Sequence, residues 1–238
     1  MSEKKSNRRD FLKNSAAAGL TALVSGAAIA DGKVFAEDYA EGKKAILMDN
    51  SLCVECQACR VACQNEYEID IEYSFIKFNS IEKGEYPDVQ YHLRRNSCMH
   101  CPDAPCIAVC PVDALSESEE GFTVIDADTC IACGRCLEIC PFDVPEIGSE
   151  RMYKCDLCQH RIKDGKVPAC VDTCVAYALD YGDYSDMLEK GKSRVEELRE
   201  DYPDANLYTA DYINDDFGLL LILKTAPKEL DLVDTRRR

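Results

Sequence analysis

The 238-residue sequence contains no tryptophan, only three histidines and, beyond its first 36 residues, no long apolar segment. A helix that crosses a bilayer needs about 20 consecutive apolar residues. We therefore expect no direct membrane span in this part of the chain. Basic residues are also scarce: the sequence has 28 basic and 44 acidic residues, and its formal net charge is −16. This charge argues against a nucleic-acid partner and against adsorption on anionic lipid, because both require a positive surface.

Motifs of catalysis are missing as well. The sequence has no glycine-rich phosphate loop, no arrangement typical of a nucleophilic triad and no metal-binding group of histidines. We therefore expect a chain that performs no bond chemistry of its own.

Cysteine, by contrast, is abundant. The run Cys130, Cys133, Cys136, Cys140 and Pro141 reads CxxCxxCxxxCP, the pattern by which bacterial ferredoxins hold [4Fe-4S] clusters. The remaining cysteines form three further sets, which are Cys53, Cys56, Cys59 and Cys63; Cys98, Cys101, Cys106 and Cys110; and Cys155, Cys158, Cys170 and Cys174. Each set ends in CxxxC, and the sixteen cysteines leave none over. The sequence therefore predicts four [4Fe-4S] clusters.

Two other uses of cysteine are less suited to this pattern. Short exported chains can carry disulfide frameworks, but these rarely repeat one spacing. Paired CxxC motifs also bind zinc, but zinc takes four ligands and does not require a CxxCxxCxxxC run.

In two-cluster ferredoxins the fourth cysteine of each run binds the cluster of the other run. The second and third sets are adjacent in the sequence, with a predicted hairpin over residues 116–125 between them, so we pair these two. Cluster site 2 then comprises Cys98, Cys101, Cys106 and Cys140, and site 3 comprises Cys110, Cys130, Cys133 and Cys136. The first and last sets remain, which gives Cys53, Cys56, Cys59 and Cys174 for site 1 and Cys63, Cys155, Cys158 and Cys170 for site 4. Spacing alone also permits pairing of the first set with the second and of the third with the fourth.

This nesting predicts an α+β fold of two interleaved ferredoxin-like modules, one inserted in the other. The first module comprises residues 37–97 and 141–182, the inserted module residues 98–140, and a helix-and-strand docking tail residues 183–238. We expect strands over 45–48, 75–81 and 89–93, a loop between Cys158 and Cys170, an amphipathic helix over 185–200 and a buried strand over 217–223.

Residues 1–36 have the pattern of an export signal, with a basic start followed by an uncharged stretch rich in alanine and glycine. Residues 6–13, SNRRDFLK, resemble the twin-arginine signal, although Ser6 lies one position further upstream than usual. The twin-arginine route carries folded proteins, which suits clusters that are assembled before export. A Sec signal or an uncleaved anchor is the alternative. We expect cleavage after Ala36, or else after Ala30, and a periplasmic protein.

Several polar side chains lie beside the cysteines. We expect His100 and His160 to be surface or supporting residues, not ligands, because each cluster already has four thiolates. Positive charge at Lys154, Arg135, Arg151 and Arg161 would raise the reduction potential of a nearby cluster, and ordinary solvated charges are the alternative.

The four ordered cysteine sets, the string CPFDVP at residues 140–145 and the segment KCDLC at 154–158 continuing to Pro168-Ala169-Cys170 resemble a known family. Over about residues 45–182 the chain is similar to the four-cluster iron–sulfur subunits of the DMSO-reductase family of molybdopterin oxidoreductases. The resemblance implies a non-catalytic electron-transfer subunit that works in anaerobic respiration. Its partners would be a molybdopterin catalytic subunit with molybdenum or tungsten and a membrane quinone-binding or cytochrome subunit. A free-standing periplasmic polyferredoxin is the alternative.

Two features point to different members of this family. Val175 follows Cys174 where many members have proline, and here the chain is more similar to tetrathionate-type subunits. The segment over residues 202–208, by contrast, is similar to small subunits of formate dehydrogenase. The sequence leaves formate dehydrogenase and sulfur-oxyanion (tetrathionate or polysulfide) reductase types open.

Overall fold

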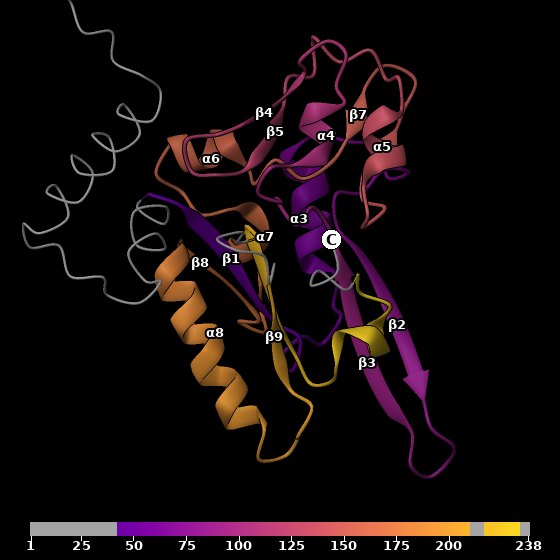
Figure 1. Cartoon of the computed structure of the whole chain (residues 1–238), viewed down its shortest axis with the longest axis vertical. Coiled ribbons are helices and arrows are strands. Elements are labelled where there is room, and N and C mark those ends of the chain that lie inside the picture. Colours follow the sequence, from indigo (N-terminus) through magenta and orange to yellow (C-terminus); the bar gives the residue numbers. More distant parts are fainter. Residues whose placement is uncertain (1–41, 210–216, 234–238) are drawn as a thin grey trace, which may run out of the picture. The chain divides into compact units, whose positions relative to one another are not determined.

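A four-stranded sheet organises the part of the chain that the structure describes (Figure 1). This structure is a computed structural model that describes residues 42–209 and 217–233, so the predicted signal peptide lies outside the described residues. The sheet has the order β8 (Leu179–Asp183), β1 (Lys44–Asp49), β10 (Leu219–Leu223) and β9 (Asn206–Tyr208). The central pair β1 and β10 is parallel, and both outer strands pair antiparallel to it.

The two central strands are apolar on both faces. All five residues of β10, LLLIL, are buried, as are the last five of β1. Continuous apolar runs of this kind are typical of strands that are covered on both sides. The strands predicted over residues 45–48 and 217–223 are confirmed, and the second lies at the centre of the sheet although it comes from the predicted tail.

One face of the sheet is covered by α8 (Tyr184–Leu198), the helix predicted over residues 185–200. Its apolar side chains Met187, Val195 and Leu198 recur at helical spacing and pack against Leu47 and Leu220. Burial of side chains of this size contributes about 1.5–3 kcal/mol each. This layer contains no cysteine.

The opposite face carries the cysteine-bearing segments. Ile46, Met48 and Leu221 point to this side, where they share a core with Cys63 and Cys170. Alternation along β1 therefore sends successive side chains to the helix layer and to the cysteine layer.

Five short helices belong to the cysteine layer: α3 (Ala58–Glu66), α4 (Pro105–Ala108), α5 (Arg135–Ile139), α6 (Gln159–Lys163) and α7 (Ala169–Asp172). The expectation of a plain loop between Cys158 and Cys170 was wrong, because α6 occupies its first half. Cys158 has φ 52° at the start of this helix, and Gly165 has φ 72° just after it. Positive φ at both ends confines the helix to little more than one turn.

The remaining strands form three small antiparallel hairpins. These are β2 (Lys77–Lys83) with β3 (Gln90–Asn96), β4 (Leu115–Glu117) with β5 (Thr123–Ile125), and β6 (Glu146–Ile147) with β7 (Met152–Tyr153). A 3-10 turn, η1 (Pro227–Leu230), packs near β3. The predicted strands before Cys98 and the predicted hairpin before Cys130 are confirmed. Mixed helices and small sheets of this kind make an α+β fold, whereas the interleaving of two modules stays a prediction.

Candidate metal centres

Three hollows in the described part of the chain are each lined by four cysteines. The first is lined by Cys53, Cys56, Cys59 and Cys174, the second by Cys98, Cys101, Cys106 and Cys140, and the third by Cys110, Cys130, Cys133 and Cys136. Their empty volumes are about 380, 390 and 350 Å³, open solvent included. These groups coincide with the cysteines predicted for sites 1, 2 and 3, and in each the fourth cysteine comes from another set in the sequence. Similar hollows with equal donor sets fit three copies of one inorganic core.

The four cysteines predicted for site 4 lie deeper. Cys63, Cys155, Cys158 and Cys170 are all buried, and they are the most enclosed of the predicted sets. Burial raises the pKa of the Cys63 thiol, and the charges of Cys170 and Cys158 raise it further. The pKa of Cys155 is likewise raised by burial first and then by Cys63 and Cys170. These effects are expected of thiols that lie near one another in the buried layer.

Four soft thiol donors around one hollow are the ligands that [4Fe-4S] clusters take. Among residues 42–209 and 217–233, no three side chains of His, Cys, Asp or Glu are drawn together closely enough to hold a single metal ion. A cubane distributes its four thiolates over four iron atoms, one on each.

The four cysteine loops share one backbone feature. The residue directly before the second cysteine of each set has positive φ. These residues are Glu55 (53°), His100 (49°), Ala132 (52°) and Leu157 (63°). Left-handed backbone is unfavourable for such side chains, so its repetition at one position marks a constraint that the loops have in common. Sequence reasoning missed it because no glycine stands at any of the four positions.

A second repeat follows the last cysteine of three sets. Asp113, Asp143 and Tyr177 each lie three residues after that cysteine and have φ between 51° and 53°. The first set differs, because α3 continues through Cys63 to Glu66. The backbone therefore makes the same left-handed turn after the last cysteine of the second, third and fourth sets.

Burial suppresses ionisation of many of these thiols. It raises the pKa of Cys59, Cys106 and Cys158 to about 11 in each case, with neighbouring cysteines adding to the effect. A cysteine must lose its proton to bind iron, so the positive charge of the metal has to offset this cost. Backbone N–H groups assist, as where Met152 donates to Cys130 Sγ at 3.4 Å and Leu157 donates to Cys155 Sγ at 3.4 Å.

The polar residues singled out in the sequence have different environments. Lys154 is 2% exposed, and its Nζ donates to the carbonyl oxygens of Thr123 and Cys155, so it is not a solvated charge. His100 is 1% exposed and is therefore not a surface residue, whereas His160 is exposed and contacts Glu66. Arg135 is exposed at the hollow of site 3.

The other two arginines have partners away from the hollows. Arg151 lies over the ring of Tyr153, and Arg161 pairs with Glu66 and Asp172.

Two supporting residues were not recognised from the sequence. Arg95 of β3 is buried beside Cys170, and Tyr67 donates its hydroxyl hydrogen to Asp156, whose Oδ1 also accepts from the N–H of Cys158. Only strand alternation could have separated Arg95 from the adjacent Arg94, which contacts the carbonyls of Leu230 and Asp231 instead.

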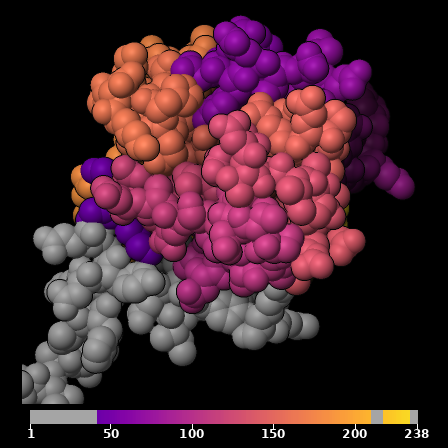
Figure 2. Space-filling view, turned by 90° about the horizontal axis from the view of Figure 1, so that it is seen from above, coloured from indigo at the N-terminus to yellow at the C-terminus, as the bar shows by residue number. Residues whose placement is uncertain are grey.

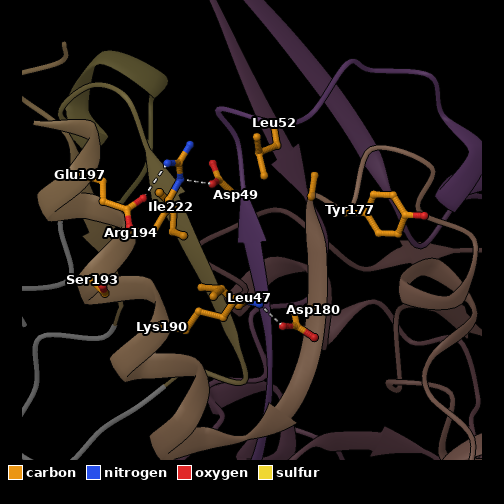
Figure 3. A pocket seen from close by; sticks show the side chains of 11 residues that line it. Leu47, Asp49, Leu52, Tyr177, Asp180, Lys190, Ser193, Arg194, Glu197 and Ile222 are labelled. Atoms are coloured by element: carbon orange, nitrogen blue, oxygen red, sulfur yellow. Dashed lines mark hydrogen bonds and ion pairs between the residues drawn. The ribbon is translucent and has the colours of Figure 1, made fainter. Parts of the chain in front are cut away.

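A further hollow lies between α8 and the strands β1 and β8, and it contains no cysteine (Figure 3). Arg194 points into it from α8 and pairs with Asp49 and Glu197 at 2.9 Å each, while Lys190 pairs with Asp180. Its charged groups thus satisfy one another.

Cysteines predicted for different sites affect one another's pKa. Besides burial, Cys136 of site 3 raises the pKa of Cys106 in site 2, and Cys98 of site 2 raises that of Cys155 in site 4. Cys170 of site 4 in turn raises the pKa of Cys59 in site 1. Figure 2 shows the segments after residue 98, coloured magenta to salmon, packed directly against the orange segments beyond residue 150. These effects link site 3 with site 2, site 2 with site 4, and site 4 with site 1.

No helix in the two described ranges has the length and apolar character needed to cross a membrane. Residues 89–184 match the family model of a 4Fe-4S dicluster domain. The chain is 32% identical over 222 residues to the formate dehydrogenase-O iron-sulfur subunit of Escherichia coli, a match that covers 84% of this chain and 70% of the relative.

Other relatives have related descriptions. The formate dehydrogenase iron-sulfur subunit of Haemophilus influenzae is 32% identical over 223 residues, with 84% of this chain and 67% of the relative covered. One of the chains of the anaerobic dimethyl sulfoxide reductase of Escherichia coli is 34% identical over 153 residues, with 60% of this chain and 75% of the relative covered. The chain belongs to the family of 4Fe-4S iron–sulfur subunits that includes those of formate dehydrogenases and dimethyl sulfoxide reductases.

Proposed function

We propose that the chain is the electron-transfer subunit of a molybdopterin oxidoreductase and holds four [4Fe-4S] clusters, one at each of sites 1 to 4. The observation that carries this proposal is that twelve of the sixteen cysteines line three hollows, four to each, while the remaining four are all buried. When bound, each cluster supplies one-electron redox chemistry. The chain's own residues fix the positions of the clusters and exclude water from site 4.

The electrostatic links between cysteines of sites 1 and 4, of sites 4 and 2, and of sites 2 and 3 support a relay that runs 1–4–2–3. Its two outer sites each expose a cysteine, Cys56 at site 1 and Cys133 at site 3. In this order site 4 stands between sites 1 and 2, and the four cysteines predicted for it are all buried. Electrons would thus enter and leave at the exposed ends, and the enclosed site would serve as an internal step.

The proposed partners are a molybdopterin catalytic subunit and a membrane quinone-linked subunit, and the proposed location is the periplasm. The relatives support a place in such a complex, since two are described as formate dehydrogenase subunits and one as a dimethyl sulfoxide reductase chain. Export by the twin-arginine route rests on Arg8 and Arg9, and replacement of both by lysine would leave the loaded protein in the cytoplasm.

The test combines metal analysis with isolation of the complex. Anaerobically purified protein should contain about sixteen iron atoms per chain, four for each cubane. Low-temperature EPR should show [4Fe-4S] signals and no prominent oxidised three-iron signal. A gentle affinity purification from membranes should recover a large pterin-containing subunit. About eight irons per chain, or a lone chain that reduces several unrelated enzymes equally well, would contradict the proposal.

A further inference from the structure

Arg95 is a buried cation in the cysteine layer. It lies on β3, is 2% exposed, and its Nε donates to Ser97 Oγ at 3.0 Å. Its Nη1 is buried without a hydrogen-bond acceptor among the described residues. None of the ion pairs found in residues 42–209 and 217–233 includes Arg95. A buried guanidinium without a carboxylate is costly, so another negative charge has to compensate it.

The groups that face Arg95 are cysteines of two different sites. Its Nη2 lies 3.9 Å from Sγ of Cys170, a residue of site 4. The same side chain lines the hollow of site 1 together with Cys53, Cys59 and Cys174. Arg95 therefore lies at the junction between sites 1 and 4.

We propose that Arg95 is a shared counter-charge that raises the reduction potentials of the clusters at sites 1 and 4, and leaves sites 2 and 3 unaffected. This inference rests on the proposed four-cluster relay. Each cubane gains one negative charge when it accepts an electron, and a fixed cation favours this reduced state. The effect is local, because interaction between charges decreases with distance, and the guanidinium lies 3.9 Å from a cysteine of site 4 and lines the hollow of site 1.

The arrangement also explains how the most enclosed site can accept an electron. Burial among apolar side chains disfavours any gain of negative charge, and site 4 has four buried cysteines. A guanidinium at its edge offsets that penalty without opening the site to water. Because the same cation also faces site 1, it stabilises the reduced state of the clusters at both site 4 and site 1.

The test is a redox titration of the complete complex followed by EPR, with each cluster assigned beforehand from a variant of one of its own cysteines. Arg95→Gln removes the charge and keeps a polar side chain. We expect the potentials of sites 1 and 4 to fall and those of sites 2 and 3 to stay unchanged. Arg95→Lys keeps the charge, so both shifts should be smaller than in Arg95→Gln.

Arg94→Gln is the matched control, since it removes the same charge from the adjacent residue of the same strand. Its guanidinium contacts carbonyl oxygens of Leu230 and Asp231, away from the hollows, so all four potentials should stay at their wild-type values. No shift in Arg95→Gln, or an equal shift at all four sites, would overturn the inference.

Cluster content separates this inference from the proposed function. The wild-type iron content tests the relay, and the variant potentials test Arg95 only after that content is established. If Arg95→Gln fails to load its clusters, Arg95→Lys carries the test. Full loading with potentials near wild type supports a role for the charge, and failure of both variants to load means that the shape of the arginine is needed, which overturns the proposal.

Discussion

Arg161 of α6 donates to Glu66 of α3, with 2.9 Å between Nη1 and Oε2, and to Asp172 of α7, with 2.9 Å between Nη2 and Oδ2. Helix α3 carries Cys63, α7 carries Cys170, and α6 directly follows Cys158. One guanidinium thus joins the three helices that position cysteines of site 4. The side chains of Arg161 and Glu66 are only 17% and 23% exposed, so solvent screens their pair less than an open surface pair.

Replacement of Arg161 by alanine should therefore loosen site 4. We expect the free energy of unfolding to decrease by about 1–2 kcal/mol, because charge-assisted hydrogen bonds are lost at a partly exposed position. Loss of iron from site 4 on exposure to a chelator should become faster. Chemical denaturation and chelator kinetics measure the two effects. Lys166→Ala, which removes only an exposed pair with Asp164, is the control and should change neither.

His92 should make the stability of the protein depend on pH. Burial lowers the pKa of this histidine, and the charges of Lys224 and Lys83 lower it further, while Glu229 opposes them. The unfolded chain then binds the proton more readily, so stability is full above the unfolded value of about 6.5 and decreases as pH falls through it. His92→Gln has no such proton to bind, and its denaturant midpoint should decrease less over this range. Parallel decreases in the two proteins would contradict the assignment.

Regular patterns in the sequence predicted much of this fold. The apolar run of β10 and the helical spacing of Met187 and Val195 identify elements whose burial decides their structure. Cysteine spacing left two pairings of the sets open, and the nested one was chosen because the second and third sets are adjacent in the sequence; the three hollows group twelve cysteines in that way. Both the apolar run and the helical spacing can be read from a few neighbouring residues, and the folded chain keeps the elements that they predict.

Other features depend on contacts that no local pattern encodes. Strand alternation can separate Arg94 from Arg95, but it does not reveal their partners, which are carbonyl oxygens of the tail for Arg94 and a cysteine for Arg95. The left-handed backbone at Leu157 is imposed by its loop and not by its residue type. Helix α6 was missed because its ends are set by positive φ at Cys158 and Gly165 and not by a capping side chain.

Gly218 should not tolerate a side chain. A Cβ atom there would stand 2.8 Å from His100 Cβ and 2.8 Å from Phe122 Cε1, and both neighbours are buried. The backbone cannot easily retreat, because the N–H of Gly218 donates to the carbonyl of His100 at 3.1 Å. Gly218→Ala should therefore cost about 1–3 kcal/mol of unfolding free energy.

Gly191→Ala is the matched control for this substitution. Its Cβ would meet mainly the terminal methyl groups of Leu207, at 2.9 and 3.1 Å, which can rotate away. Alanine is also preferred over glycine in a helix by about 1 kcal/mol. In denaturant titrations, Gly218→Ala should have a clearly lower free energy of unfolding than Gly191→Ala. The reverse order would show that His100 can move to make room for the added methyl group.

Lys154 should tune the cluster at site 2. Its buried ammonium group lies at the hollow lined by Cys98, Cys101, Cys106 and Cys140. Lys154→Met removes the charge with little change in length, so the potential of this cluster should decrease, as measured by EPR-monitored titration. Two carbonyl groups also lose their donor, which should cost about 1–3 kcal/mol each in stability. Arg135→Met, at an exposed position beside site 3, should produce a smaller shift there, and equal shifts would argue against an effect of burial.

Cys140 offers the sharpest test of how the cysteine sets are shared. It lines the hollow of site 2 with Cys98, Cys101 and Cys106, although the cysteine four positions earlier, Cys136, lines the hollow of site 3. Cys140→Ser should therefore change the EPR signal and the iron retention of site 2 while site 3 keeps its cluster.

Cys136→Ser is the matched control on the same short segment, and it should give the opposite result. The contrast is informative because the two residues lie at the ends of α5, so a general disturbance of that helix would affect both sites in both variants. Loss of the cluster at site 3 in Cys140→Ser, with site 2 intact, would show that each run binds its own fourth cysteine. In that case the fourth cysteine would not be exchanged between the second and third sets. The nested arrangement would then lose its physical basis, since shared thiolates are what join the two runs into one unit.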